Sequence, residues 1–311
     1  MRFEHSLRPA TAFAGAALWF GAPAAWSMAI EANVEWTLGG VPPAASDTDG
    51  PAATGSVDVL DGDTDTSNNS VFYHTYGNTT GTFGSRVSGG GTYDIDGIFT
   101  FAETFIATSS APTFLFEIIP GQIDARQYYG ATATDMPGGE EVRAGYEIEV
   151  RLDGGSIWSS FGEVWVDDGG THTHFTGTSI GGSLTLDPGG TFASYSWSVF
   201  NGNVALGTFT PGDSFLLEYD LRTFSSANTD ADGCTDGGIG GDPGRPGQPT
   251  EPGTLGSGCG AGIAQSGDPF SFSNSSAASI SGAVPAPAPA TLGLLSAGLA
   301  GIGALRRRRR A

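Results

Sequence analysis

Two acidic stretches have the residue types and the spacing of calcium ligands. In each predicted loop, Asp or Asn side chains recur at alternate positions. The candidate ligands are Asp61, Asp63 and Asp65 in "DGDTDTSNN" and Asn228, Asp230, Asp232 and Asp236 in "NTDADGCTD". Calcium prefers about six to eight hard oxygen ligands, and alternate carboxylates in a turn can converge on one ion. Structural calcium is therefore a candidate cofactor, with ordinary acidic loop residues as the alternative.

The second stretch resembles the opening of an EF-hand loop, with Asn228 at the first position and Gly233 at the sixth. The twelfth position is Ile239, where an EF-hand needs a bidentate Glu. No helical pattern flanks the stretch. We therefore do not predict an EF-hand.

Carboxylates and histidines on two predicted strands form another group of candidates. Glu163, Trp165 and Asp167 alternate in "GEVWVDDGG", as carboxylates and aromatic residues do in glycosidases built on β-sandwiches. His172 and His174 in "THTHF" would share one strand face, where they could bind a transition metal or simply form polar surface. The sequence has no nucleophile elbow, phosphate-binding glycine motif or HExxH. We expect no enzymatic activity, with a polysaccharide-active hydrolase as one alternative.

Aromatic residues could provide a platform on which sugar rings stack. The candidates are Tyr128, Tyr129, Trp158, Phe161, Trp165 and Trp197. Trp165 and Trp197 sit at alternating strand positions and are assigned to the core, because large aromatic residues dominate sandwich interiors. The "RQYYG" segment is predicted to be a loop and is the better surface candidate.

The two cysteines, Cys234 and Cys259, lie within the Gly- and Pro-rich stretch 229–268. In an exported chain, two such cysteines most simply form one disulfide. Closing a loop of this size would stabilise the fold by roughly 3–4 kcal/mol in the chain-entropy model. We predict a disulfide-closed loop and no metal-binding thiol pair.

The elements that must position these residues are β-strands. The clearest has Tyr146, Ile148, Val150 and Leu152 alternating with charged residues, the pattern of an antiparallel strand with one wet face. Turn signals such as "DGG" and "DPGG" separate the strands. Strands are predicted at 57–60, 71–76, 97–107, 114–119, 146–152, 156–166, 171–176, 183–186, 195–199, 204–209, 215–221 and 269–273. The sequence therefore predicts an all-β, antiparallel sandwich or jelly-roll-like domain over residues 30–273.

The N-terminus has the layout of a secretory signal peptide over residues 1–29. Arg2 and Arg8 precede an apolar stretch, and small residues follow near Ser27 and Ala29. Seven of the 13 basic residues lie in the terminal segments. The body between them has six basic and 32 acidic residues, a net charge of −26, and no lysine. Such a surface repels phosphate backbones, so we expect no nucleic-acid partner.

The C-terminus has three consecutive parts. Residues 274–289 are predicted to be a flexible linker that ends in "VPAPAPA", residues 290–305 an apolar helix, and residues 306–311 a basic cytoplasmic tail. The helix would be about 24 Å long, slightly short for a bilayer core of about 30 Å. Arginines behind the helix favour an orientation with the body outside. We predict a single transmembrane sorting helix that holds the chain in the inner membrane transiently.

This three-part tail resembles the PEP-CTERM sorting signals of Gram-negative bacteria, over residues 284–311 only. The residues that carry the resemblance are Val284, Pro285, Pro287, Pro289, Ala290, Arg306, Arg307, Arg308, Arg309 and Arg310. Where the family has a central Glu, this chain has Ala286 or Ala288. The resemblance implies processing by an exosortase-type membrane protease, and sorting to the outer surface or to an exopolysaccharide or biofilm matrix.

Three functions fit the sequence. The leading hypothesis is an exported, non-enzymatic structural or adhesive matrix protein. The second is a lectin-like module that binds extracellular polysaccharide, and the third is the hydrolase. The body itself shows no motif of a known activity.

Overall fold

The computed structural model describes residues 28–41, 44–53, 55–79, 82–118, 120–230, 259–266 and 276–286, which belong to one compact unit. These residues form an all-β structure of two sheets in which every strand pairing is antiparallel. The described part has one short 3-10 helix, η1 (Ala133–Asp135), and no α-helix. The all-β, antiparallel prediction is therefore confirmed.

The first sheet, sheet A, has eight strands. In spatial order they are β11 (Gly170–Gly177), β10 (Gly155–Asp167), β9 (Glu141–Leu152), β15 (Ser214–Asn228), β6 (Thr92–Ala107), β1 (Ala29–Leu38) and β2 (Ala45–Ala52), and β18 (Ala283–Pro285) pairs with the end of β6. Its centre is the long pair of β6 and β15, in register from Thr92 opposite Asn228 to Ile106 opposite Ser214.

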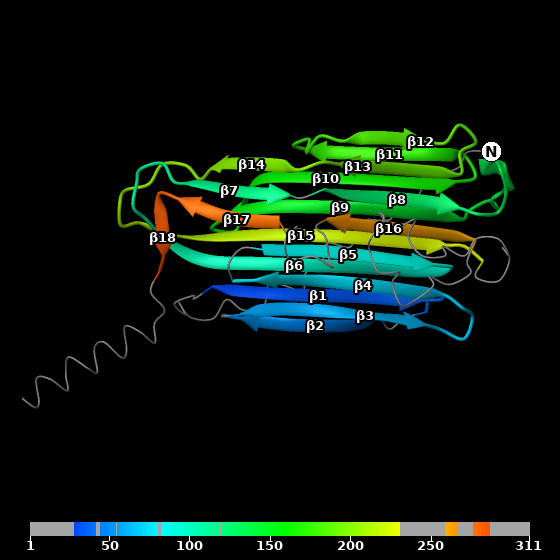
Figure 1. The fold of residues 1–311 in the computed structure, drawn as a ribbon, viewed down its shortest axis with the longest axis horizontal. Coiled ribbons are helices and arrows are strands. Elements are labelled where there is room, and N and C mark those ends of the chain that lie inside the picture. The colour runs from blue at the N-terminus through cyan, green and yellow to red at the C-terminus, as the bar shows by residue number, and fades with distance from the viewer. Residues whose placement is uncertain are drawn as a thin grey trace, which may run out of the picture. The chain divides into compact units, whose positions relative to one another are not determined.

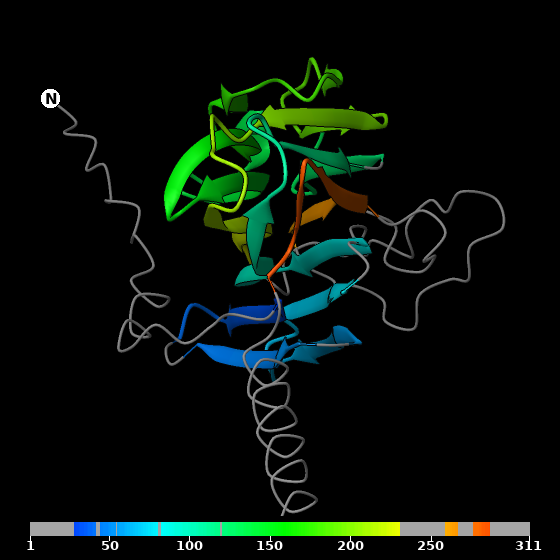
Figure 2. The same ribbon diagram turned by 90° about the vertical axis from the view of Figure 1, so that its left-hand side faces the viewer.

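The second sheet, sheet B, has ten strands. The main path runs β12 (Ser183–Leu186), β13 (Phe192–Trp197), β8 (Gly121–Gln127), β16 (Gly260–Ser266), β5 (Thr82–Gly90), β17 (Ser276–Ser281), β7 (Thr113–Ile118) and β14 (Phe200–Ala205). From β5 the sheet also continues to β4 (Ser70–Asn78) and β3 (Ser56–Thr64). The two sheets lie face to face as two layers (Figures 1 and 2).

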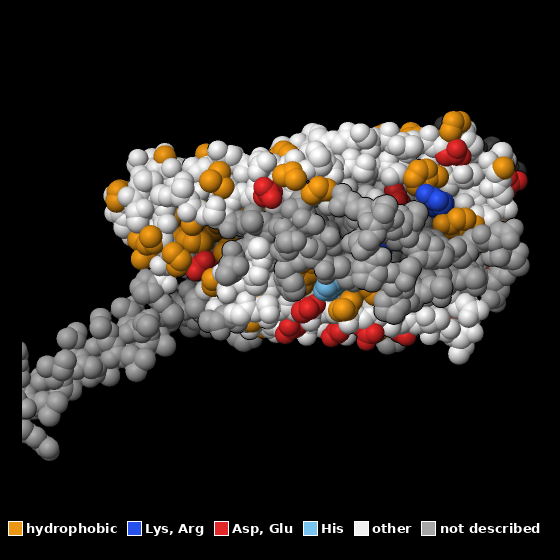
Figure 3. Space-filling view, viewed as in Figure 1, with side chains coloured by type: hydrophobic (Ala, Val, Ile, Leu, Met, Phe, Trp, Pro, Cys, Tyr) orange, Lys and Arg blue, Asp and Glu red, His pale blue; other side chains and the backbone are white. Residues whose placement is uncertain are grey.

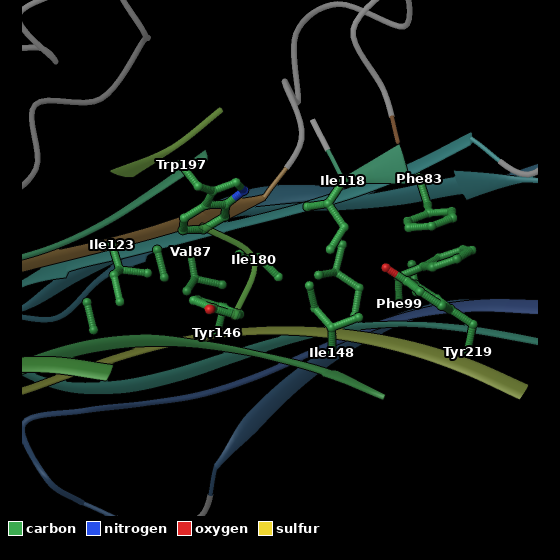
Figure 4. Close-up of a cluster of buried hydrophobic side chains, with 14 of the residues drawn as sticks. Phe83, Val87, Phe99, Ile118, Ile123, Tyr146, Ile148, Ile180, Trp197 and Tyr219 are labelled. Carbon is green, nitrogen blue, oxygen red and sulfur yellow. The ribbon is translucent and has the colours of Figure 1, made fainter. Parts of the chain in front are cut away.

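Alternating burial along the strands creates the core between the sheets. In β15, every second residue from Phe215 to Ala227 is buried, and Phe215, Leu217, Tyr219 and Leu221 are each at most 1% exposed. Tyr219 contacts Phe83 of sheet B, whose ring stacks on Phe99 of sheet A at a centroid distance of 5.0 Å. Figure 4 shows these rings interdigitating with aliphatic side chains from both layers. Burial of this apolar surface is what holds the layers together.

The predicted strands are largely present. The prediction for 183–186 matches β12, and those for 146–152 and 215–221 lie inside the longer β9 and β15. The prediction for 204–209 is displaced, since β14 ends at Ala205. The sequence prediction omitted β1, β2, β5, β8, β16, β17 and β18. β2, β5, β16 and β17 are rich in small or polar residues and lack an apolar alternation. β1 was missed although its apolar and polar residues alternate.

Two predicted irregular segments contain strands. The loop prediction for 229–268 is wrong for Gly260–Ser266, which form β16 between β5 and β8. Position 262 of this strand needs glycine, because an added Cβ would lie 2.3 Å from Ser225 Oγ. The flexible-linker prediction is wrong for 276–286, because β17 pairs with β7 and β18 pairs with β6.

The remaining terminal predictions lie mostly outside the described residues. These are the strand at 269–273, the helix at 290–305, the basic tail and almost all of the signal peptide. At the N-terminal boundary, β1 begins at Ala29. Within the described part of the chain, no helix is long and apolar enough to cross a membrane.

Candidate functional site

The predicted carboxylates and histidines meet on the outer face of sheet A. The β10–β11 hairpin places Glu163 opposite His174 and Trp165 opposite His172. The predicted alternation on both strands is confirmed, and the two histidines do share a face. Sequence reasoning missed that the two motifs lie side by side, although the "DDGG" turn between them is a hairpin signal.

Trp165 stands in a stack that crosses three strands. The His172 ring lies 5.1 Å from the indole with an interplanar angle of 17°, and the Arg143 guanidinium lies 4.9 Å from the ring. Arg143 comes from β9, where it is opposite Trp165. Because His172 and Arg143 flank Trp165 from the two neighbouring strands, the stack leaves little of the indole faces for a sugar ring.

The same side chains form ion pairs. Arg143 pairs with Glu141 at 2.9 Å and with Glu163, and the Asp167 carboxylate lies 2.9 Å from His172 Nε2. Glu163 is only 7% exposed. Although burial alone would lower it, the pKa of Arg143 is raised, because Glu141 and Glu163 accept its hydrogen bonds. The two carboxylates considered for the hydrolase alternative are therefore each paired with a neighbouring side chain.

A second aromatic and ionic row lies beside the first. The Phe224 ring from β15 leans over Gly145 of β9, where an added Cβ would lie 2.2 Å from the ring. The Phe224 ring stacks on the Phe161 ring at a centroid distance of 6.0 Å. The Arg222 guanidinium carbon lies over the Phe224 ring, 4.7 Å from its centroid. Arg222 also pairs with Asp96 at 2.7 Å. Glycine at position 145 is thus needed for this contact between β15 and β10.

A third arginine continues the pattern. Arg151 pairs with Glu149 at 3.2 Å, with Glu218 at 3.6 Å and with Asp220 at 2.5 Å. Burial raises the pKa of Asp220 to about 6, and Arg151 only partly offsets it. The outer face of sheet A is therefore a cross-strand network that joins β9, β15 and β6.

The structure corrects one aromatic assignment and confirms another. Trp165 was predicted to be in the core, but it is half-buried on the outer face of sheet A. The prediction failed because alternation identifies the two faces of a strand without saying which is inward. Trp197 is in the core, 4% exposed and 4.9 Å from the Tyr146 ring (Figure 4).

The first predicted calcium loop is partly a strand. β3 continues to Thr64, so Asp61 and Asp63 lie on the strand, and Asp63 Oδ2 accepts a hydrogen bond from Trp36. Asp65 lies in the turn, where it accepts hydrogen bonds from Ser67 N, Asn69 N and Asn69 Nδ2. Despite some burial, these bonds lower the pKa of Asp65. Within the described residues, no group of three His, Cys, Asp or Glu could hold a metal ion.

The second predicted calcium loop is described only at its start. β15 ends at Asn228, and Asp230 N donates to Tyr129 Oη at 2.9 Å. Asp232, Asp236 and Cys234 lie outside the described residues. Cys259 is fully buried and disulfide-bonded. Calcium at this loop and the Cys234–Cys259 pairing remain predictions.

Arg126 forms a separate patch on the outer face of sheet B. Its guanidinium lies 4.3 Å from the Phe192 ring and interacts with the phenol of Tyr128. Arg126 is exposed, and no carboxylate of the described residues is within 4.0 Å of it, in contrast to Arg143, Arg151 and Arg222. The prediction that "RQYYG" is a loop holds for Tyr128 and Tyr129, both half-buried, and is wrong for Arg126 and Gln127, which end β8.

His74 lies on sheet B, away from the two histidines of β11. It is 6% exposed, and its Nε2 lies 2.8 Å from Asp58 Oδ1. Burial lowers the pKa of His74, and Asp58 only partly opposes this effect. The pair links β4 to β3 across the outer face.

No protein-family model matches this chain, and no match is found among curated proteins.

Proposed function

We propose that this chain is an exported, non-enzymatic structural or adhesive component of an exopolysaccharide or biofilm matrix, sorted through its PEP-CTERM-like tail. The observation that supports this most is the network on sheet A, in which carboxylates pair with arginines of neighbouring strands. Side chains paired in this way tie neighbouring strands together, which suits a structural role. The acidic, lysine-free body is also suited to remaining soluble in a crowded matrix.

The geometry argues against the hydrolase hypothesis. Glu163 and Asp167 are four residues apart on β10, which separates their Cα atoms by roughly 13 Å. Glycosidase carboxyl groups lie about 5–10 Å apart and face a common sugar, so these two side chains would have to lean toward one another to act together. Here one carboxylate is paired with Arg143 and the other with His172.

A complementation experiment tests this proposal. Deletion of the gene should weaken retention of the extracellular matrix, and the wild-type chain should restore it. A double variant, Glu163→Gln with Asp167→Asn, should restore it equally well if it folds, as checked by its thermal unfolding. Loss of complementation together with loss of reducing-end release from the organism's polysaccharide would support a hydrolase instead.

The Arg126 patch favours a second candidate function, carbohydrate binding. An exposed guanidinium beside aromatic rings can donate several hydrogen bonds to sugar hydroxyls or carboxylates while the rings contact the sugar. Glycan-array binding by the purified chain tests this candidate. Arg126→Ala should abolish the signal, whereas Thr185→Ala on the exposed strand β12 should retain it.

The sorting proposal has an independent test in the intact mass of the mature protein. Processing by an exosortase-type protease predicts loss of Arg306 to Arg310. Their retention in the mature protein would contradict C-terminal processing without affecting the role proposed for the body.

A further inference from the structure

Exposed apolar side chains gather along one rim of the two sheets. Nine large hydrophobic residues of the described chain are exposed, and five lie at this rim, with exposures of 38–47%. These five are Ile157, Phe175, Leu184, Leu186 and Val199. We call this surface the uncharged rim and define it by β11, β12, β14 with Val199, and Gly155–Trp158 of β10. Figures 1 and 2 show these strands together at one end of the stack.

The strands of the uncharged rim carry no formal charge. From Gly170 to Leu186 the sequence contains no Asp, Glu, Arg or Lys, and β14 and Gly155–Trp158 contain none either. The opposite rim is formed by β2 and β3, whose acidic residues are Asp47, Asp49, Asp58, Asp61 and Asp63. Figure 3 shows acidic side chains along the rim of β2 and β3, whereas the rim above β12 is mostly uncharged.

The two rims also differ in how they present backbone groups. β11 pairs with β10 alone, and its register is regular from Ser160 opposite Gly177 to Asp167 opposite Gly170. β2 contains Pro51 and has a register irregularity opposite Ile30 and Ala32. Charges, prolines and bulges are the usual devices that prevent a strand edge from pairing with another chain. The edge at β2 has all three, and β11 has none.

We propose that the uncharged rim binds a second copy of this chain, with β11 pairing edge to edge with the partner's β11. Two bodies of net charge −26 repel one another, so the uncharged rim is the surface on which two copies can meet. Antiparallel pairing of β11 with itself would extend a sheet whose strands all pair in the antiparallel sense. β11 offers eight residues, about 26 Å of edge, with Phe175 exposed beside it. β14 is shorter and is interrupted by Gly202.

The proposed contact uses the same strand on both copies and therefore closes as a dimer. The acidic rim remains outside and prevents further edge-to-edge growth. This inference rests on the proposed structural function and extends it, because a dimer would contact the matrix through two copies of the body.

Sedimentation equilibrium of the full chain over a range of concentrations tests the proposal. We expect a reversible dimer that tightens as sodium chloride screens the net charge. Phe175→Lys combined with Leu184→Lys should weaken dimerisation by roughly tenfold or more, because the contact would then have to desolvate lysine charges on the uncharged rim of both copies. Leu60→Lys is the matched control, since Leu60 is 52% exposed on the edge strand β3.

Thermal unfolding of the variants establishes that they fold. If the double variant does not fold, concentration-dependent protection of the β11 amides from hydrogen exchange in the wild-type chain takes its place. A monomer at every concentration, unchanged protection of β11, or equal weakening by Leu60→Lys would overturn the inference. The complementation experiment is independent of these results, so failure of the dimer would be distinguishable from failure of the matrix role.

Discussion

Glu103 places a carboxyl group inside the fold. It lies on β6 opposite Leu217, on the same side of the strand as Phe105, and is 7% exposed. Burial raises its pKa to about 7, and within the described residues no hydrogen-bond donor offsets this effect. The protonated form is therefore the one that the folded state accommodates.

This burial predicts a pH-dependent stability. The folded-state pKa of Glu103 is above its unfolded value. Burial of Glu103 therefore does not lower the free energy of unfolding below about pH 4.5, and lowers it progressively as the pH rises from 4.5 through 7. Glu103→Gln should raise the free energy of unfolding by about 1–3 kcal/mol at pH 8 and have little effect at pH 4.5. Urea unfolding at both pH values measures the difference. An equal effect at both would show that packing, and not ionisation, is responsible.

Asp65 gives a prediction about calcium. Asp65→Ala removes an acceptor of three hydrogen bonds in the turn before β4, so we expect a loss of about 1 kcal/mol. The loss should be the same with calcium and with a chelator, because the bonds are internal to the protein. Thermal unfolding under both conditions decides the matter. Destabilisation confined to the calcium-containing sample would assign Asp65 to a metal site.

At the scale of single strands, the packing of Phe224 over Gly145 predicts an asymmetry between two glycines. Gly145→Ala should destabilise the fold by about 1–3 kcal/mol, because its Cβ would overlap the Phe224 ring and disturb the contacts with Phe161 and Arg222. Gly155→Ala is the control, since a Cβ there meets Leu152 O at 3.5 Å.

Denaturant unfolding of both glycine variants measures this effect. The Gly155 variant should remain within about 0.5 kcal/mol of the wild type. Comparable losses in the two variants would indicate a general cost of replacing glycine on these strands, and the proposed role of the Phe224 contact would then be wrong.

Most strands that alternate large apolar and polar residues were predicted, whereas strands built from small residues were not. The exception is β1, which was missed although Ile30, Val34 and Trp36 alternate with polar residues. Over residues 146–152 of β9 and 215–221 of β15, large apolar residues occupy every second position, and the outward charges were placed correctly. β16 consists of Gly, Ala, Ile, Gln and Ser, and its interior position depends on close contacts such as Gly262 N donating to Tyr93 Oη at 2.8 Å. Such contacts come from tertiary packing, which local sequence does not encode.

In the candidate site, features that depend on one strand alone could be predicted, whereas features that depend on how two strands pair could not. The sequence correctly paired His172 with His174 on one face, because that depends only on the period of a strand. It could not predict that Arg143 would lie opposite Trp165, because that depends on the register between β9 and β10. Trp165 was misplaced for the related reason that an alternating strand does not reveal its inner face.

At the scale of the whole molecule, the rim of β2 and β3 is an acidic surface, because these two strands have five aspartates and no arginine. Burial is the main reason that the pKa of the Tyr73 phenol is raised, and the nearby carboxylates of Asp47, Asp61 and Asp63 raise it further. The arginines of sheet A are clustered elsewhere and are engaged by their own carboxylates. The acidic rim is therefore repulsive, and this repulsion acts against the folded state.

This repulsion predicts that sodium chloride stabilises the protein. Raising the concentration from about 0.02 to about 0.5 M shortens the screening length severalfold, which weakens repulsion between exposed aspartates more than it weakens the partly buried pairs of sheet A. The melting temperature should rise by a few degrees. Asp47→Asn with Asp61→Asn should raise it at low salt and reduce the further gain from salt, since both side chains are exposed at the acidic rim. Calorimetry of the two chains at both salt concentrations checks the prediction, and a melting temperature that falls with salt would show that the arginine pairs outweigh the acidic rim.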